Sequence, residues 1–249
     1  MAGSDKKRQN NLAAGIQAIL FDKDGTLFDF HSTWLPLLRE AASLAARGDE
    51  ALIPKLMALG GHDDLSGRIV SGSVLAAGDT VELVASWASH IEGWQKATLV
   101  ERLDALFATK GPIRAAPVTE LPPLMRQLRA QGYRLGLATN DTEAAARATI
   151  ARFEIDPYFD FHCGYDSGHG SKPLPGMAHA FCDTVGLSPE NIAVVGDNGH
   201  DLEMGHAVGA GLIVGVLTGT SAHADLAPRA DAVIQSIAEL PALLAQRRL

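Results

Sequence analysis

The sequence predicts an α/β protein: a Rossmann-like parallel sheet with helices on both faces and a helical segment inserted after the first strand. Apolar, strand-like runs alternate with helical stretches along most of the 249 residues, as in parallel sheets covered on both faces. A block rich in Ala, Leu and Glu with little strand character interrupts this alternation once. We therefore expect a core domain of residues 12–29 and 111–249 and an inserted helical domain of residues 30–110.

The composition excludes several classes of partner. The net charge of -8 argues against nucleic acid and against an anionic membrane, because both select basic surfaces. No apolar run approaches the roughly 20 residues of a membrane span, and the polar residues 1–11 lack the apolar centre of a signal sequence, so we expect them to form a tail. The two cysteines show no metal-type spacing, and we expect a reduced, cytoplasmic protein, either a monomer or a homodimer.

The first strand carries the most informative pattern in the chain. Ala18–Phe21 is continuously apolar, as expected for a strand buried on both faces. Two carboxylates, Asp22 and Asp24, follow it directly, at the end of the strand where open α/β sheets place their ligands. Gly25 allows the chain to turn sharply there.

The inserted segment is expected to consist of helices. The first helix would begin with Ser32 or Thr33 as its N-cap and end near Gly48. Further helices are expected at residues 50–59, 80–90 and 95–108.

Regular alternation resumes after the insertion. Strands are expected at residues 133–139, 159–165, 191–197, 211–217 and 231–234, and helices at 121–131, 142–153, 177–185 and 201–207 and at the C-terminus. Polar residues stand at or just beyond the ends of two of these strands: Thr139 with Asn140, and Asp197 with Asp201. Because parallel strands end at one edge of the sheet, we expect these groups to meet Asp22 and Asp24.

Four carboxylates in one crevice can all stay ionised only beside a cation. A small set of oxygen ligands with open positions suits Mg²⁺, which can also bind a phosphate oxygen. The Thr139 hydroxyl can hydrogen-bond a phosphate, and Lys172 can offset the charge of carboxylates and phosphate. An aspartate can accept a phosphoryl group, and a second one can transfer protons.

The ordered set of motifs resembles the haloacid dehalogenase superfamily, in its phosphoglycolate phosphatase-like branch with a C1-type helical cap. The motifs are Asp-Lys-Asp-Gly-Thr at 22–26, Ala-Thr-Asn at 138–140, Lys-Pro at 172–173, and Gly-Asp at 196–197 followed by Asp201. Each motif alone is weakly specific, whereas the four in this order are strongly so. The resemblance covers roughly residues 15–29 and 111–249. The inserted helical domain of residues 30–110 corresponds to the cap of this family.

The resemblance implies a catalytic role for three residues. Asp22 would be the nucleophile and a Mg²⁺ ligand. Asp24 would be the general acid and base, with its backbone carbonyl on the metal. Lys172 would position the nucleophile and screen charge. Lys23 stands where relatives often have an aliphatic residue, and we expect it to point away from the carboxylates and to have little functional weight.

The resemblance also implies the binding residues. Thr139 and Asn140 would hold the phosphoryl group, Asp197 and Asp201 would complete the metal site, and Arg68 in the cap would face the substrate. Ordinary structural explanations exist as well: Thr139 and Asn140 can cap a helix, Asp201 can favour a helix N-terminus by its charge, and Arg68 can be a surface residue.

The implied activity is that of a Mg²⁺-dependent phosphatase. Its partner would be a small phosphorylated metabolite, such as phosphoglycolate or a sugar phosphate, hydrolysed through an aspartyl-phosphate. Asp24 disfavours dehalogenation, because dehalogenases lack an acid/base aspartate at this place. A phosphomutase of the β-phosphoglucomutase type and a non-catalytic phosphate-binding module remain the alternatives.

Overall fold

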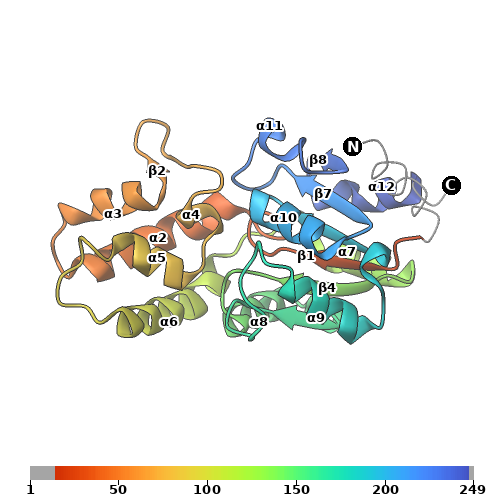
Figure 1. The fold of residues 1–249 in the computed structure, drawn as a ribbon, viewed down its shortest axis with the longest axis horizontal. Coiled ribbons are helices and arrows are strands. Elements are labelled where there is room, and N and C mark those ends of the chain that lie inside the picture. Colours follow the sequence, from red (N-terminus) through yellow and green to blue (C-terminus); the bar gives the residue numbers. More distant parts are fainter. Residues whose placement is uncertain (1–14, 247–249) are drawn as a thin grey trace.

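A computed structural model describes residues 15–246 and confirms the predicted fold class. A sheet of six parallel strands lies beside a group of helices (Figure 1). The polar tail expected at residues 1–11 lies outside the described residues. The strand order is β5-β4-β1-β6-β7-β8. In chain order the strands are β1 (Ala18–Phe21), β4 (Arg134–Ala138), β5 (Phe161–Cys163), β6 (Ile192–Gly196), β7 (Leu212–Val216) and β8 (Ala232–Ile234).

Strand β1 lies in the middle of the sheet and is fully buried. Phe21 is in register with Leu137 of β4 and Val195 of β6. The segments that follow these three strands therefore leave the sheet at the same edge, and they carry the polar residues singled out from the sequence.

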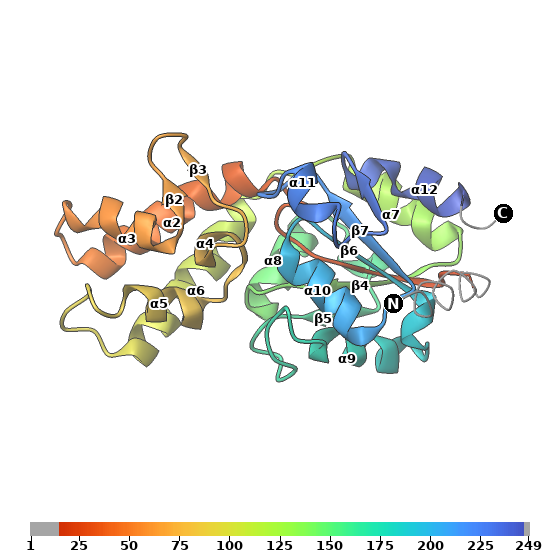
Figure 2. The same cartoon turned by 45° about the horizontal axis from the view of Figure 1, so that its top comes forward.

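Helices cover both faces of the sheet (Figures 1 and 2). Alternate residues of β1 point to opposite faces, so Ile19 and Phe21 belong to one hydrophobic cluster while Ala18 and Leu20 belong to another. The first cluster includes residues of α7 (Leu121–Ala130), α8 (Glu143–Arg152) and α12 (Leu240–Gln246). The second includes residues of α9 (Gly176–Val185), α10 (Gly199–Val208) and α11 (His223–Leu226).

The inserted segment, residues 30–114, has a hydrophobic cluster of its own, which includes the fully buried Trp87. The expected helices are present, together with a short helix and a two-stranded hairpin that were not expected. Two-residue strands are too short to show an alternating pattern, so the sequence gives no sign of them. The elements are α2 (Phe30–Ala46), α3 (Leu52–Gly60), β2 (His62–Asp63), β3 (Arg68–Ile69), α4 (Val74–Ala77), α5 (Thr80–Trp87) and α6 (Lys96–Arg114).

The first inserted helix begins earlier than expected, and the prediction of Ser32 or Thr33 as its N-cap is wrong. The N-cap is Asp29, whose carboxylate accepts a hydrogen bond from the backbone N–H of Ser32 at 2.8 Å. An aspartate is as good an N-cap as serine, and its position three residues before Ser32 places Ser32 and Thr33 inside the first turn.

The last inserted helix, α6, ends at Arg114, six residues beyond the expected end. It packs against α8, which belongs to the sheet domain. Lys110 and Arg114 both form ion pairs with Glu40, so the additional residues of α6 contact α2.

The described part of the chain contains no helix that is both long and apolar enough to cross a membrane. Cys163 and Cys182 are both buried, and neither forms a disulfide. Burial raises the pKa of each thiol to about 11, so both stay protonated at neutral pH.

Candidate active site

Three buried aspartates and one buried lysine meet at the edge of the sheet. Asp22, Asp197 and Asp201 each offer a carboxylate oxygen, and these oxygens lie within 4.8 Å of one another. The Lys172 ammonium donates to Asp22 Oδ1 and Asp201 Oδ1, at 2.6 Å each, and to the Ala138 carbonyl at 3.2 Å. The structure thus brings together residues that are up to 179 positions apart, as the parallel sheet predicted.

The electrostatics of this cluster favour an additional cation. Burial raises the pKa of Asp22 to about 7, with Lys172 lowering it and Asp201 raising it further. Burial raises the pKa of Asp197 well above its usual range, and Asp22 and Asp201 add to the effect. Burial alone would lower the pKa of Lys172, but Asp201 and Asp22 outweigh it and keep the lysine charged. One ammonium does not balance three carboxylates.

The arrangement fits Mg²⁺. The Oδ2 atom of Asp22 is buried and has no hydrogen-bond partner among the described residues, so it is available as a ligand or nucleophile. Gly25 lies against Asp197 with φ of +89°, and a Cβ at Gly25 would come within 2.5 Å of the Asp197 Cγ atom. Only glycine allows both the backbone angle and this close approach. Asp22, Asp197 and Asp201 supply the hard oxygen donors that Mg²⁺ prefers.

Asp201 serves the helix and the cluster at once. Its Oδ2 atom accepts a hydrogen bond from the backbone N–H of Asn198 at 3.2 Å, which completes a capping box at the start of α10. Its Oδ1 atom accepts from Lys172. The capping explanation and the metal-site explanation of this residue are therefore compatible.

The structure contradicts the expectation for Lys23. Its ammonium lies 3.0 Å from Asp24 Oδ2 and donates to Asp141 Oδ2 at 2.5 Å. The expectation assumed that the strand pleat continues through residue 23, but β1 ends at Phe21 and Lys23 lies in the following turn. Lys23 therefore contacts the second carboxylate of the motif rather than pointing away from it.

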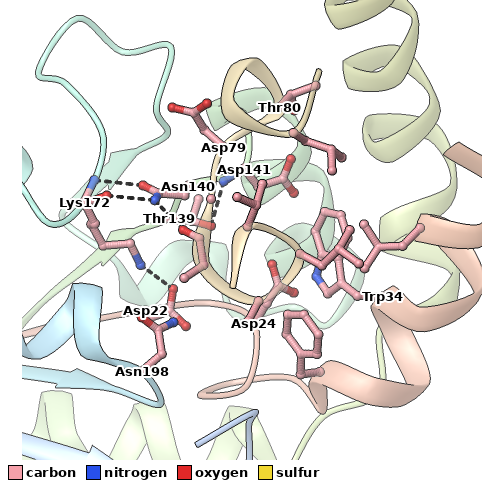
Figure 3. A pocket seen from close by; sticks show the side chains of 18 residues that line it. Asp22, Asp24, Trp34, Asp79, Thr80, Thr139, Asn140, Asp141, Lys172 and Asn198 are labelled. Atoms are coloured by element: carbon pink, nitrogen blue, oxygen red, sulfur yellow. Dashed lines mark hydrogen bonds and ion pairs between the residues drawn. The ribbon is translucent and has the colours of Figure 1, made fainter. Parts of the chain in front are cut away.

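Asp24 is surrounded by groups that act on its charge. Burial raises its pKa, Lys23 opposes this, and Asp141 adds to it. The indole N–H of Trp34 also lowers the pKa of Asp24. It faces this carboxylate (Figure 3), although the two groups are not positioned for a regular hydrogen bond. The ring of Trp34 packs on Phe107 with centroids 5.0 Å apart, and Trp34 also lines the active-site pocket.

Thr139 and Asn140 both line the pocket, in different ways. The Thr139 hydroxyl accepts a hydrogen bond from the backbone N–H of Asp141 at 3.1 Å and keeps its own proton for a ligand. The Asn140 amide is already engaged: it donates to the carbonyls of Ala77 and Lys172, at 2.8 and 3.1 Å, and accepts from the Lys172 N–H at 2.9 Å. Asn140 thus fastens the Lys172 segment and the inserted helices to the site (Figure 3).

The inserted segment closes over this edge through the turn between α4 and α5. The Ala77 carbonyl accepts from Asn140 and lies 3.2 Å from His200 Nδ1. Asp79 Oδ2 accepts from the Ser171 hydroxyl at 2.5 Å. The pocket beneath this turn is small. Its cavity volume is about 70 Å³, which is enough for a few water molecules or a small ligand.

Arg68 does not reach this pocket. It is exposed on the hairpin strand β3 and is not among the lining residues. Sequence reasoning missed Asp79, Asp141 and Asn198, which do line it. Asp141 and Asn198 each directly follow one of the motifs, so their position in the sequence could have indicated them. Asp79 lies in the insertion, where its sequence context indicates only a helix N-cap.

The chain belongs to the haloacid dehalogenase-like hydrolase family, whose model matches residues 16–209. It is therefore a hydrolase of the class that the fold and the aspartate cluster define. It is 28% identical over 250 residues to the phosphoglycolate phosphatase of Escherichia coli strain K12, covering 92% of each chain.

Solved structures show the same fold. A predicted phosphoglycolate phosphatase from Haemophilus somnus 129PT superposes with a TM-score of 0.68 at 22% identity, over 92% of this chain and 97% of the other. The CbbY protein from Rhodobacter sphaeroides, solved in complex with phosphate, gives a TM-score of 0.64 at 22% identity, over 90% and 96%.

Proposed function

We propose that this protein is a Mg²⁺-dependent phosphatase that hydrolyses a small phosphomonoester through an aspartyl-phosphate on Asp22. The observation that carries the proposal is the state of Asp22. One of its oxygens accepts from Lys172, while the other is buried without a partner among residues 15–246. The relatives named phosphoglycolate phosphatase support the same reaction class.

In the first step the free oxygen of Asp22 attacks the phosphorus atom and the ester oxygen leaves. Lys172 favours the ionised form of Asp22 and orients its carboxylate, because the ammonium is hydrogen-bonded to both Asp22 and Asp201. The Thr139 hydroxyl donates a hydrogen bond to a phosphoryl oxygen. Asp24, whose pKa burial raises, protonates the leaving oxygen.

In the second step Asp24, now ionised, takes a proton from water, and this water attacks the phosphorus of the aspartyl-phosphate. Asp22 and inorganic phosphate are released. Bound Mg²⁺ would be held by Asp22, Asp197 and Asp201, with the Asp24 backbone carbonyl as a further proposed ligand, and would offset the charge of the phosphoryl oxygens.

We further propose that residues 30–110 act as a cap that excludes bulk water. The contacts of Ala77 and Asp79 with Asn140, His200 and Ser171 close the pocket over the reacting groups. Breaking these few hydrogen bonds would open the site for exchange of substrate and product, and this opening would limit turnover if it is slower than the chemistry.

The sharpest test uses p-nitrophenyl phosphate, whose leaving group departs without protonation. An Asp24→Asn variant should release about one equivalent of nitrophenolate per enzyme and then stall, because Asp22 is phosphorylated but no base activates water. Reduction of the stalled protein with borohydride should convert residue 22 to homoserine, as detected by mass spectrometry of its peptide.

The matched control is Asp22→Asn, which keeps the shape of the side chain but has no nucleophilic oxygen. It should give neither the burst nor homoserine. Wild-type activity in this variant, with circular dichroism showing a normal fold, would refute the mechanism. Activity should also be lost with a chelator and restored by Mg²⁺. With a sugar phosphate as substrate, a phosphatase releases free phosphate, whereas a mutase gives an isomerised sugar phosphate.

A further inference from the structure

We infer that the leaving-group side of this pocket is built for an uncharged, largely apolar group and selects against a leaving group that carries a carboxylate. The inference rests on the proposed phosphatase function and narrows its substrate class. It separates this chain from the reaction named for its relatives, because phosphoglycolate carries a carboxylate beside the ester oxygen.

The wall that the inserted segment contributes to the pocket is mostly apolar. Its side chains come from α2, from α4 and the turn after it, and from α5. The residues are Phe30, Trp34, Leu38, Leu83 and those from Val74 to Thr80. The charged member of this wall is Asp79, an acid, whose carboxylate already accepts from the Glu82 backbone and from Ser171.

The pocket has no cation to spare among the residues that the structure describes. Lys172 is the only cation that lines it within residues 15–246, and its ammonium is shared between Asp22 and Asp201. Lys23 does not line the pocket, and its ammonium is paired with Asp24 and Asp141.

The cations of the insertion are placed elsewhere. Lys110 and Arg114 pair with Glu40, and Arg47 and Arg102 lie over the ring of Trp94. The remaining ones, Arg39, Lys55, Arg68 and Lys96, are exposed and do not line the pocket.

A substrate carboxylate would therefore be buried without a counter-charge. The turn between α4 and α5 is docked on the sheet domain by two hydrogen bonds: the Ala77 carbonyl accepts from Asn140, and Asp79 accepts from Ser171. This docked turn fixes the apolar wall opposite the catalytic residues. A carboxylate on the leaving group would meet apolar side chains and the acids Asp24 and Asp79. Removing a carboxylate from water without a compensating partner is strongly unfavourable. An uncharged group meets no such penalty and gains from burial against the wall.

The test compares phosphoglycolate with its uncharged isostere, 2-phosphoglycolamide, and with n-propyl phosphate, at pH 7 with Mg²⁺ present. The kcat/KM for the amide and for propyl phosphate should exceed that for phosphoglycolate by about tenfold or more. Each compound is also measured as a competitor of p-nitrophenyl phosphate, so a compound that is not turned over still reports its affinity.

A pair of variants tests the missing cation directly. Val74 lines the pocket and is partly exposed, so a longer side chain can be accommodated there. The Val74→Lys variant should raise the ratio of phosphoglycolate to phosphoglycolamide activity by about tenfold over that of Val74→Met, which has a similar length and no charge.

The outcomes separate the two proposals. If phosphoglycolate is hydrolysed as well as its amide, or binds as tightly, the inference about the leaving group is overturned and the phosphatase function stands. If none of the esters releases phosphate, including p-nitrophenyl phosphate, both proposals are overturned. Preference for the uncharged esters, reduced by Val74→Lys but not by Val74→Met, is the expected result.

Discussion

Replacing Lys23 with methionine should destabilise the fold and remove the cation that contacts both Asp24 and Asp141. The side chain of Lys23 is 3% exposed and that of Asp141 is 4% exposed, with 2.5 Å between Nζ and Oδ2. At this separation the Coulomb attraction is about 7 kcal/mol for an effective dielectric constant of about 20. Desolvation of both groups offsets much of it, and removing one partner of such a pair costs about 3–5 kcal/mol.

The cost arises mainly from the carboxylate left behind. In Lys23→Met the Oδ2 atom of Asp141 is buried without its ammonium, and Asp24 loses the cation that opposes the effect of burial on its pKa. The double variant Lys23→Met with Asp141→Asn removes the unpaired charge. Its loss of unfolding free energy should therefore be smaller than the sum of the two single losses, by about 2–3 kcal/mol.

Urea unfolding at pH 7, followed by circular dichroism and tryptophan fluorescence, measures this coupling. The control cycle uses Lys110→Met and Glu40→Gln, an ion pair whose side chains are 45% and 31% exposed. Its coupling should stay below about 1 kcal/mol. If the losses of unfolding free energy at Lys23 and Asp141 add to within about 0.5 kcal/mol, the ion pair between them does not stabilise the segment that follows β1.

Three further changes test other parts of the structure. The pKa of Asp160 lies below its usual range, because two arginines and a backbone N–H outweigh the effect of burial. Its charge therefore stabilises the fold above about pH 4 and is lost as the pH falls, so Asp160→Asn should cost about 1–3 kcal/mol in urea unfolding at pH 7 and less at pH 3. Ser171→Ala removes the hydrogen bond to Asp79 and should raise the KM for p-nitrophenyl phosphate several-fold, with the helix cap at Asp79 left intact; an unchanged KM counts against the docked turn. Gly25→Ala places a methyl group against Asp197 and should abolish the thermal stabilisation by Mg²⁺, whereas an unaltered shift in Tm would contradict the placement of the metal.

The sheet and its polar edge could be predicted because both follow from local patterns. A continuously apolar run identifies a strand buried on both faces, and the parallel arrangement then brings the strand ends together regardless of their separation in the chain. Asp22 and Asp201 were predicted to meet in this way, and in the structure both accept a hydrogen bond from Lys172, which was predicted from its charge and from the family resemblance.

The side chains beyond the strand ends could not be predicted by the same reasoning. The direction of Lys23 depends on where β1 stops: the strand ends at Phe21, so the alternation of faces along the strand does not extend to residue 23. The docking of the insertion depends on the backbone carbonyl of Ala77, which carries no signal in the sequence. The substrate-facing role of Arg68 was inferred from the position of an arginine in relatives. The sequence does not specify the loop conformations of this segment, so it does not determine where Arg68 lies.

The residues that hydrogen-bond the insertion lie on the same loops as Thr139 and Lys172, two of the predicted site residues. Asn140 follows Thr139 directly, and Ser171 precedes Lys172. The Asn140 amide holds the Lys172 backbone and the Ala77 carbonyl at the same time. Undocking the turn would therefore remove one of the three hydrogen bonds that fix this amide, and the constraint on the Lys172 segment would weaken with it. A ligand that keeps the apolar wall in place would, in the proposed mechanism, stabilise through Asn140 the position of Lys172 next to Asp22. The proposed selection of the leaving group and the proposed activation of Asp22 would therefore be coupled through the Asn140 side chain.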